Sequence, residues 1–467
     1  MQTLLPVPQG RPQTRILTPA LLSSLLSFGA TTAGIAQALP ETTEVPGLAP
    51  FPPATTFYDV REIPTAPWLP TSTPATPDWL DTGYSPSPLL RPGLGTAAIG
   101  DNLIPSARGA GQRRTQGTPF PVGPIDVGFD VSYGLTYGTG LLAGPNREED
   151  SFRHSLTPGL NIYAGDRWSL RYAPSATFYS ADGYKDTFDH LVNLAGSATA
   201  PGWVFGLNHV TSISSQPLIE TGRQTDQTLH SSGLSGNWTP NDRDAFSFSL
   251  SQSIRFADDA PDSYSWLSQN WYDRTLTDRI SAGIGLGAGY DFLDPGTDMV
   301  PVRLNGRLQG SLGTKFSYTV SGGAERREFL DGDASANISP LVSVSLTYQV
   351  FEKTSVFVGF DHSVDISYFN NQFTENSSLQ GGVNYNFSQK WSVSALGGFR
   401  DTSYLSTEVS DQVGREDNST FANLTISWRI LKRLTTALTY SFRANSSDQA
   451  GFDFDSHQVG LRITYFL

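Results

Sequence analysis

The sequence predicts an all-β fold, a transmembrane antiparallel up-and-down β-barrel of about 18 strands that follows a disordered proline-rich N-terminal segment. Three observations predict this fold. Apolar side chains alternate with polar or small ones from Asp126 to the last residue. The alternating segments are each about ten residues long, the length of a tilted strand that crosses a bilayer. Short turns alternate between them with long loops, predicted to include residues 325–335 and 368–376, as in barrels of the outer membrane.

The period of two is clearest at the two ends of the predicted barrel. Residues 127–137 place Val, Phe, Val, Tyr, Leu and Tyr at odd positions and Gly, Asp, Ser, Gly and Thr between them. Residues 459–467 repeat the pattern. A strand with one apolar and one polar face separates two environments. If both ends of the barrel lie in the periplasm, the strand number is even, and 16 or 20 strands would also satisfy the pattern.

Residues 1–38 have the features of a secretory signal peptide. Arg11 and Arg15 provide the positive charge, an interrupted apolar stretch follows, and Ala36-Gln37-Ala38 matches a cleavage site. A membrane anchor is the alternative, but the stretch is short and contains Pro19. We therefore expect export through a cleaved signal peptide to the bacterial outer membrane.

Residues 39–125 form a separate proline-rich segment that contains 17 of the 31 prolines. Proline fixes φ and lacks an amide hydrogen, so neither helices nor central strands propagate through it. We expect a periplasmic linker, and a plug inside the barrel is the alternative. The barrel domain then covers residues 126–467.

Composition excludes several classes of function. The chain has no cysteine, which excludes a thiol nucleophile and Cys-ligated metals. The net charge of −13 argues against nucleic-acid binding. The six histidines show no metal-binding spacing, and we expect no cofactor and no enzymatic activity. A rim site in which His190 and His209 act with Ser212 or Ser214 is conceivable, but chance placement is favoured because serine is abundant.

Five tryptophans lie beside predicted short turns, where an indole ring favours the level of the lipid headgroups. These predicted membrane-interface residues are Trp168, Trp203, Trp238, Trp391 and Trp428.

The polar phase of the strands contains the charged residues that we predict to line the lumen. They are Arg153, Arg171, Arg255, Arg303, Arg307, Arg400, Arg429, Arg443 and Arg462, with Asp130, Asp361 and Asp365. Guanidinium groups in a water-filled channel favour anions. Alternatively, they pair with acids on loops that fold inward. The neutral residues of this phase suit hydrated solutes such as saccharides.

Two further patterns bear on the lumen and the loops. Residues 283–289 carry glycine at every second position, which indicates a strand with a bare lumen face rather than a phosphate-binding loop. The acids gather in the predicted long loops. A solvated surface explains them, and cations that bridge them to lipopolysaccharide are the alternative.

The signal peptide, the proline-rich segment, the short basic turns and the terminal residues 458–467 resemble the outer-membrane β-barrel families grouped as porins. The resemblance implies a passive channel and recognition of the last strand by the barrel-assembly machinery. Such a barrel contacts outer-membrane lipid and lipopolysaccharide, and a homo-oligomer is an open alternative. The second hypothesis is a structural or adhesive barrel whose N-terminal segment binds peptidoglycan or a periplasmic partner.

Overall fold

The fold was analysed in a computed structural model of the chain, which describes residues 120–139, 150–165, 167–215, 217–218, 223–258, 260–330, 335–369, 371–406 and 414–467. The predicted signal peptide, the proline-rich segment up to residue 119 and part of the loop acids lie outside these residues. In the described ranges all regular structure is β. No helix there is long and apolar enough to cross a membrane.

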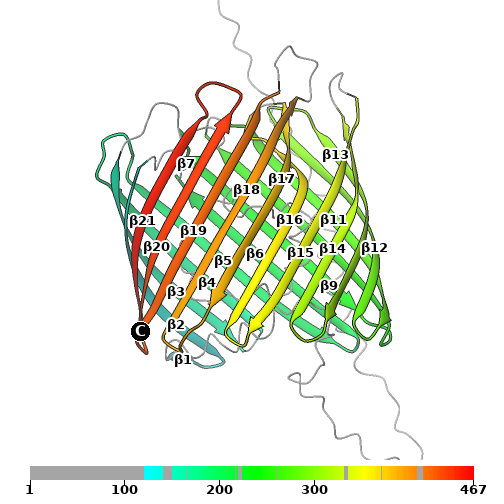
Figure 1. Cartoon of the computed structure of the whole chain (residues 1–467), viewed down its shortest axis with the longest axis horizontal. Helices are drawn as coiled ribbons and strands as arrows, with labels where there is room; N and C mark the ends of the chain where they lie inside the picture. The colour runs from blue at the N-terminus through cyan, green and yellow to red at the C-terminus, as the bar shows by residue number, and fades with distance from the viewer. Residues whose placement is uncertain are drawn as a thin grey trace, which may run out of the picture. The chain divides into compact units, whose positions relative to one another are not determined.

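Eighteen long strands form the wall of a barrel (Figure 1). They are β2 (Ile125–Thr139), β3 (Ser151–Ala164), β4 (Trp168–Tyr179), β5 (Thr187–Ala200), β6 (Trp203–Ser214), β9 (Gln227–Trp238), β10 (Asp244–Ala257), β11 (Asp262–Thr277), β12 (Ile280–Asp294), β13 (Met299–Leu312), β14 (Phe316–Phe329), β15 (Asn337–Phe351), β16 (Thr354–Ile366), β17 (Gln372–Tyr385), β18 (Trp391–Ser406), β19 (Glu416–Leu431), β20 (Leu434–Ser447) and β21 (Phe454–Phe466).

The barrel is closed by pairing of its first and last wall strands. Each wall strand is antiparallel to the next one along the chain, and β2 also pairs with β21 in the register Asp130↔Phe466 to Thr139↔His457. Closure leaves no unpaired edge, which is the condition for a β-structure to span a bilayer. The predicted antiparallel barrel of 18 strands is thereby confirmed.

Three short strands lie outside the wall. β1 (Phe120–Val122) pairs with the start of β2, and β7 (Pro217–Leu218) pairs with β8 (Arg223–Gln224) in the connection between β6 and β9.

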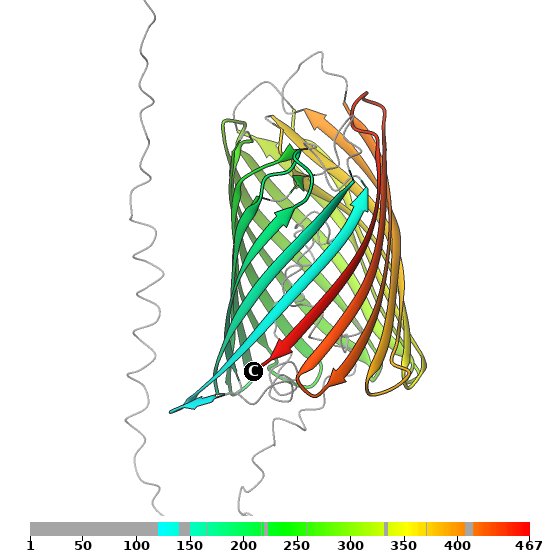
Figure 2. The ribbon, with the colours of Figure 1, turned by 90° about the vertical axis from the view of Figure 1, so that its left-hand side faces the viewer.

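The two ends of the barrel differ in their connections (Figure 2). At one end, here called the short-turn end, the connections include residues 201–202, 278–279, 352–353 and 432–433. The opposite end, the long-loop end, carries connections such as 140–150, 407–415 and 448–453. Some strands extend further than the sequence predicted. The expected loop 368–376 is only 367–371, because β17 begins at Gln372 and continues the ladder with β16.

Candidate functional site: the lumen and its long-loop end

The wall has an apolar outer face and a polar inner face. In β2, Phe129, Val131 and Tyr133 are 39–43% exposed, whereas Asp130 and Ser132 between them are buried. Large hydrophobic side chains are exposed in the same phase on the other wall strands. In water this arrangement would be unfavourable, but in hydrocarbon it is the expected one.

Aromatic rings border this apolar face at both ends. At the short-turn end, Trp203 stacks on Trp238 at 5.6 Å between ring centroids, and Trp391 stacks on Trp428 at 5.0 Å. Trp168 opens β4 at the same end and is exposed. At the long-loop end Tyr264 contacts Phe256 and Phe292 on the neighbouring strands. Two aromatic girdles around an apolar band decide the class of protein. The chain is a β-barrel of the outer-membrane type.

All twelve charged residues singled out by the sequence lie on the inner phase of their strands. Eleven are buried or half-buried, and Arg429 is exposed near the short-turn end of β19. Three of the nine arginines, Arg171, Arg303 and Arg307, bind carboxylates of the wall itself, a pairing that the sequence analysis did not predict.

The first ion-pair cluster joins β2, β3 and β4. Arg171 donates to both carboxylate oxygens of Asp130 at 2.9 and 3.1 Å, and to the side-chain oxygen of Asn161 at 2.8 Å. Asn161 in turn donates to Asp130 at 2.8 Å. The charge of Arg171 is therefore compensated within the wall.

The second cluster lies on β11 to β14. Arg307 donates to both oxygens of Asp273 at 2.7 and 2.5 Å, while its guanidinium carbon lies 4.2 Å from the centroid of the Trp271 ring. Nearer the long-loop end, Glu325 accepts from Arg303 at 2.5 Å and from Arg327 at 2.7 Å. Buried guanidinium groups need such carboxylates, because an unpaired charge in this environment is costly.

The sequence analysis missed the partner acids of this second cluster. Glu325 and Arg327 were placed in a loop, but β14 continues to Phe329 and carries both on its inner face. Asp273 could have been found from its phase, since it alternates with the inner residues Gln269 and Trp271.

A segment of the β16–β17 connection reaches across the lumen at the long-loop end. Ser367 and Tyr368 are buried. Arg255 on β10 donates to the backbone oxygen of Ser367 at 3.0 Å, and its guanidinium carbon lies 3.9 Å from the Tyr368 ring centroid. The Tyr368 hydroxyl donates to Gln227 on β9 at 3.3 Å. Because β10 is six strands from β16 in the wall, these contacts span the interior. Residues 367–369 are called the crossbar below.

The far end of the crossbar is held by an aromatic cluster. Phe369 packs edge-on against Tyr404 of β18 and Phe452 of the β20–β21 loop, with centroids 6.3 and 6.5 Å apart. The Arg415 guanidinium carbon lies 3.7 Å from the Phe452 ring centroid and 4.3 Å from that of Tyr404. Asp417 accepts from Arg415 at 2.9 Å. The long-loop mouth is thus narrowed by contacts on both sides of the crossbar.

The inner faces of β5, β6, β9 and β10 have a different composition. Below the long-loop end they carry small neutral polar residues, which include Asn193, Ser197, Asn208, Ser231, Ser235, Ser247, Ser249, Ser251 and Ser253. This part of the wall is called the neutral arc, and the inner faces of β11 to β18 are called the charged arc. Uncharged hydroxyl and amide groups suit hydrated solutes without selecting for charge.

The glycines of β12 do not leave the lumen wall bare. Large inner side chains of β11 cover them: Trp271 lies over Gly285, and Gln269 lies beside Gly287. The expectation of extra lumen space at residues 283–289 is therefore wrong. The glycines instead accommodate the bulky residues of the neighbouring strand.

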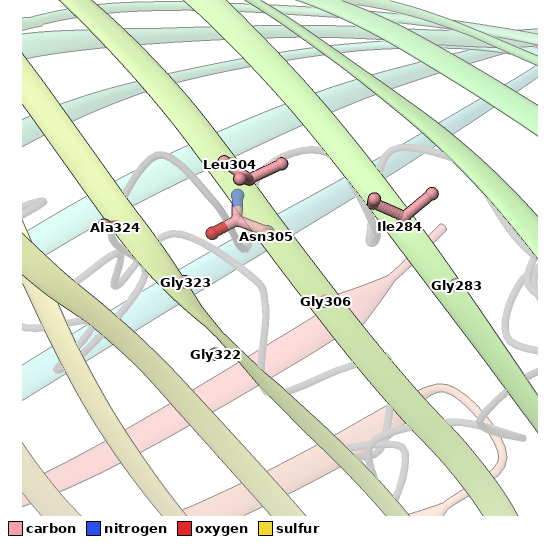
Figure 3. A pocket seen from close by; sticks show the side chains of 8 residues that line it. All are labelled: Gly283, Ile284, Leu304, Asn305, Gly306, Gly322, Gly323 and Ala324. Atoms are coloured by element: carbon pink, nitrogen blue, oxygen red, sulfur yellow. The ribbon is translucent and has the colours of Figure 1, made fainter.

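A separate hollow of about 530 Å³ lies over β12, β13 and β14 (Figure 3). Gly306 and Gly322, which pair across β13 and β14, form its floor, and Ile284 and Leu304 rise beside it. Both of these side chains are 56% exposed and belong to the outer face. The hollow is consequently part of the lipid-facing surface and not of the lumen.

The histidines all lie on the outer phase and are bound to neighbouring hydroxyl groups. His154, His190 and His457 accept from or donate to Tyr133, Tyr172 and Tyr440 at 2.8–2.9 Å. Ser212 and Ser214 are on the inner phase of β6, so the wall separates them from His190 and His209. The hypothesis of a catalytic site at the rim, formed by these histidines and serines, is therefore wrong. Among the described residues no group of His, Asp or Glu could hold a metal ion.

The family model of surface lipoprotein assembly modifiers matches residues 267–463, less than half of the chain. No curated protein matches. Similar solved structures include the siderophore receptor PirA (12% identity, 73% of this chain and 80% of that chain covered, TM-score 0.38), OpdO (10%, 73% and 97%, 0.40) and OpdK with vanillate (12%, 73% and 98%, 0.40), all from Pseudomonas aeruginosa. The fold stands on the closed register of the strands and not on these distant similarities.

Proposed function

We propose that the protein is a porin-like channel through which small hydrophilic solutes diffuse passively across the outer membrane. The observation that carries the proposal is the crossbar of residues 367–369, which spans a polar lumen. Barrels of 16 to 18 strands are wide enough to enclose an aqueous channel. The interior of such a barrel is too wide to be filled by side chains alone. A segment that crosses it narrows the channel and so sets the size limit for solutes.

The lumen favours neutral solutes such as saccharides over anions. Asp130 neutralises Arg171, Asp273 neutralises Arg307, and Glu325 binds Arg303 and Arg327, so these arginines attract anions less. Polar hydroxyl and amide groups line the neutral arc, and Trp271 lies over the inner glycines of β12. The hydroxyl groups of a sugar can form hydrogen bonds with the polar groups of the neutral arc. An aromatic ring such as that of Trp271 can pack against the apolar face of a sugar ring.

Liposome swelling with saccharides of increasing size tests this function. Proteoliposomes with the full-length protein should swell in mono- and disaccharides and progressively less in larger oligosaccharides. Protein-free vesicles are the control. Swelling no faster than in this control for every sugar would contradict the channel.

A second candidate function is a role in the assembly of surface lipoproteins. The family match over residues 267–463 favours it, since these residues include β12 to β20 completely and most of β21. The test is protease shaving of whole cells with and without the gene. A loss of surface-exposed lipoproteins in the deletion strain, with unchanged sugar uptake, would favour this role over the channel.

The location and partners follow from the same proposal. A cleaved signal peptide would export the chain to the outer membrane, where the barrel would contact lipid and lipopolysaccharide. Strand β21, which closes the barrel, would be recognised by the barrel-assembly machinery. Whether residues 39–125 act as a linker or a plug, or bind peptidoglycan, depends on residues almost all outside those described.

A further inference from the structure

One sector of the outer face carries uncharged polar side chains on four adjacent strands. It contains His209 and Thr211 on β6, His230 and Ser232 on β9, Gln252 on β10, and Ser268 and Asn270 on β11. These residues share the outer phase and follow one another across four adjacent strands. They are called the outer-face polar stripe.

The stripe lies inside the apolar band and not at its borders. On β10, Gln252 stands between the exposed Phe246 and Phe256 on the same face. On β11, Ser268 and Asn270 stand between the exposed Trp266 and Leu276. Hydrocarbon offers no hydrogen bonds, so polar groups at this depth need partners.

Internal hydrogen bonds satisfy only part of the stripe. His209 bonds Ser232 and Thr211, both at 2.9 Å. Thr211 also bonds His230 at 3.0 Å, and Ser232 donates to Gln252 at 3.3 Å. The amide of Gln252 receives this bond through its oxygen, while its nitrogen donates to no described residue. The side-chain nitrogen of Gln252 is therefore available to donate to a neighbouring molecule.

We propose that the outer-face polar stripe is the contact surface for a second copy of the barrel, related by a two-fold axis along the membrane normal. Rotation about that axis keeps every residue at its depth, so polar groups of one copy face polar groups of the other. The side chains are uncharged amides, hydroxyls and imidazoles that both donate and accept, so they can pair with themselves without repulsion. A contact with lipopolysaccharide phosphates would instead require Lys or Arg, and none is in the stripe.

The outer face of the adjoining strands β12 and β13 contrasts with the stripe. On β12 and β13, Ile284, Leu286 and Leu304 are exposed and apolar, as lipid contact requires. Polar side chains between membrane segments promote association, because their alternative is an unsatisfied group in hydrocarbon. The proposed dimer contact therefore lies on β6 and β9 to β11, beside the apolar outer face of β12 and β13.

Cysteine cross-linking in liposomes tests the dimer directly, because the chain has no cysteine of its own. Full-length Gln252→Cys and Ser232→Cys proteins, reconstituted alone, should give a covalent dimer with a short bismaleimide. Leu304→Cys, on the lipid-facing side of β13, is the matched control and should stay monomeric. No dimer from either stripe variant, or equal dimer from Leu304→Cys, would overturn the proposal.

A cysteine-free measurement separates the interface from the fold. The double variant Ser232→Ala with Gln252→Leu should raise the dimer dissociation constant in lipid nanodiscs roughly tenfold. The loss of two or three hydrogen bonds between membrane-spanning segments has an effect of about this size. Leu304→Ala should leave it unchanged, and heat-modifiable migration in electrophoresis would verify that both variants are folded. A monomeric wild type that cross-links only to a different protein in native membranes would contradict the second copy.

Discussion

The neutral and charged arcs of the lumen are built from strands of the same kind but from different inner side chains. On the neutral arc, Ser249 makes one hydrogen bond, to the backbone oxygen of Gln269. On the charged arc, Glu325 holds two buried arginines at once. Small hydroxyl groups can exchange a wall contact for water at little cost, whereas the ion pairs must stay assembled. If the barrel is the proposed channel, this difference assigns the path of the solute to the neutral arc and a structural role to the charged arc.

The largest effect is expected from removal of the central carboxylate of the charged arc. Glu325→Gln removes the buried carboxylate that Arg303 and Arg327 share and should lower the free energy of unfolding by about 3–5 kcal/mol. Ser249→Ala on the neutral arc is the control and should cost about 1 kcal/mol. Urea unfolding in lipid vesicles, followed by tryptophan fluorescence, measures both. Equal losses would remove the distinction between the arcs.

A smaller effect on ion selectivity should follow from Asp273→Asn. The change removes the negative charge that Arg307 binds and should raise the permeability ratio of chloride to potassium roughly fivefold, as about 1 kcal/mol of added attraction would. The reversal potential in a KCl gradient reports this ratio. The double variant with Arg307→Gln should return it to the wild-type value, and a persistent shift would show that the pair does not control selectivity.

The smallest effect is expected from a larger side chain on the proposed path of the solute. Ser251→Trp narrows the neutral arc and should slow disaccharide swelling by about half, because uptake depends on the free cross-section. Ser343→Trp on β15, within the charged arc, is the matched control and should change uptake less. The opposite order would move the path to the charged arc.

The sequence predicted the phase of the residues better than their contacts. Alternation alone places Arg303 and Arg307 on the inner face, because a side-chain period of two leaves no other choice. Their partners depend on register across strands, and Glu325 was missed because β14 runs past its predicted end. The contact of Arg255 with Ser367 joins residues 112 positions apart and exists only because the wall curves into a barrel. No local pattern carries that information.

Single-channel conductance in planar bilayers tests the crossbar as the size-limiting element most directly. The full-length protein should give small, discrete steps. Tyr368→Ala with Arg255→Ala, which removes the contacts to β9 and β10, should give clearly larger steps while Glu325 and its arginines keep the barrel intact. Ser343→Ala on the inner face of β15 serves as the control and should leave the conductance unchanged. Equal conductance for wild type and double variant, or no steps from any of these proteins, would contradict the account.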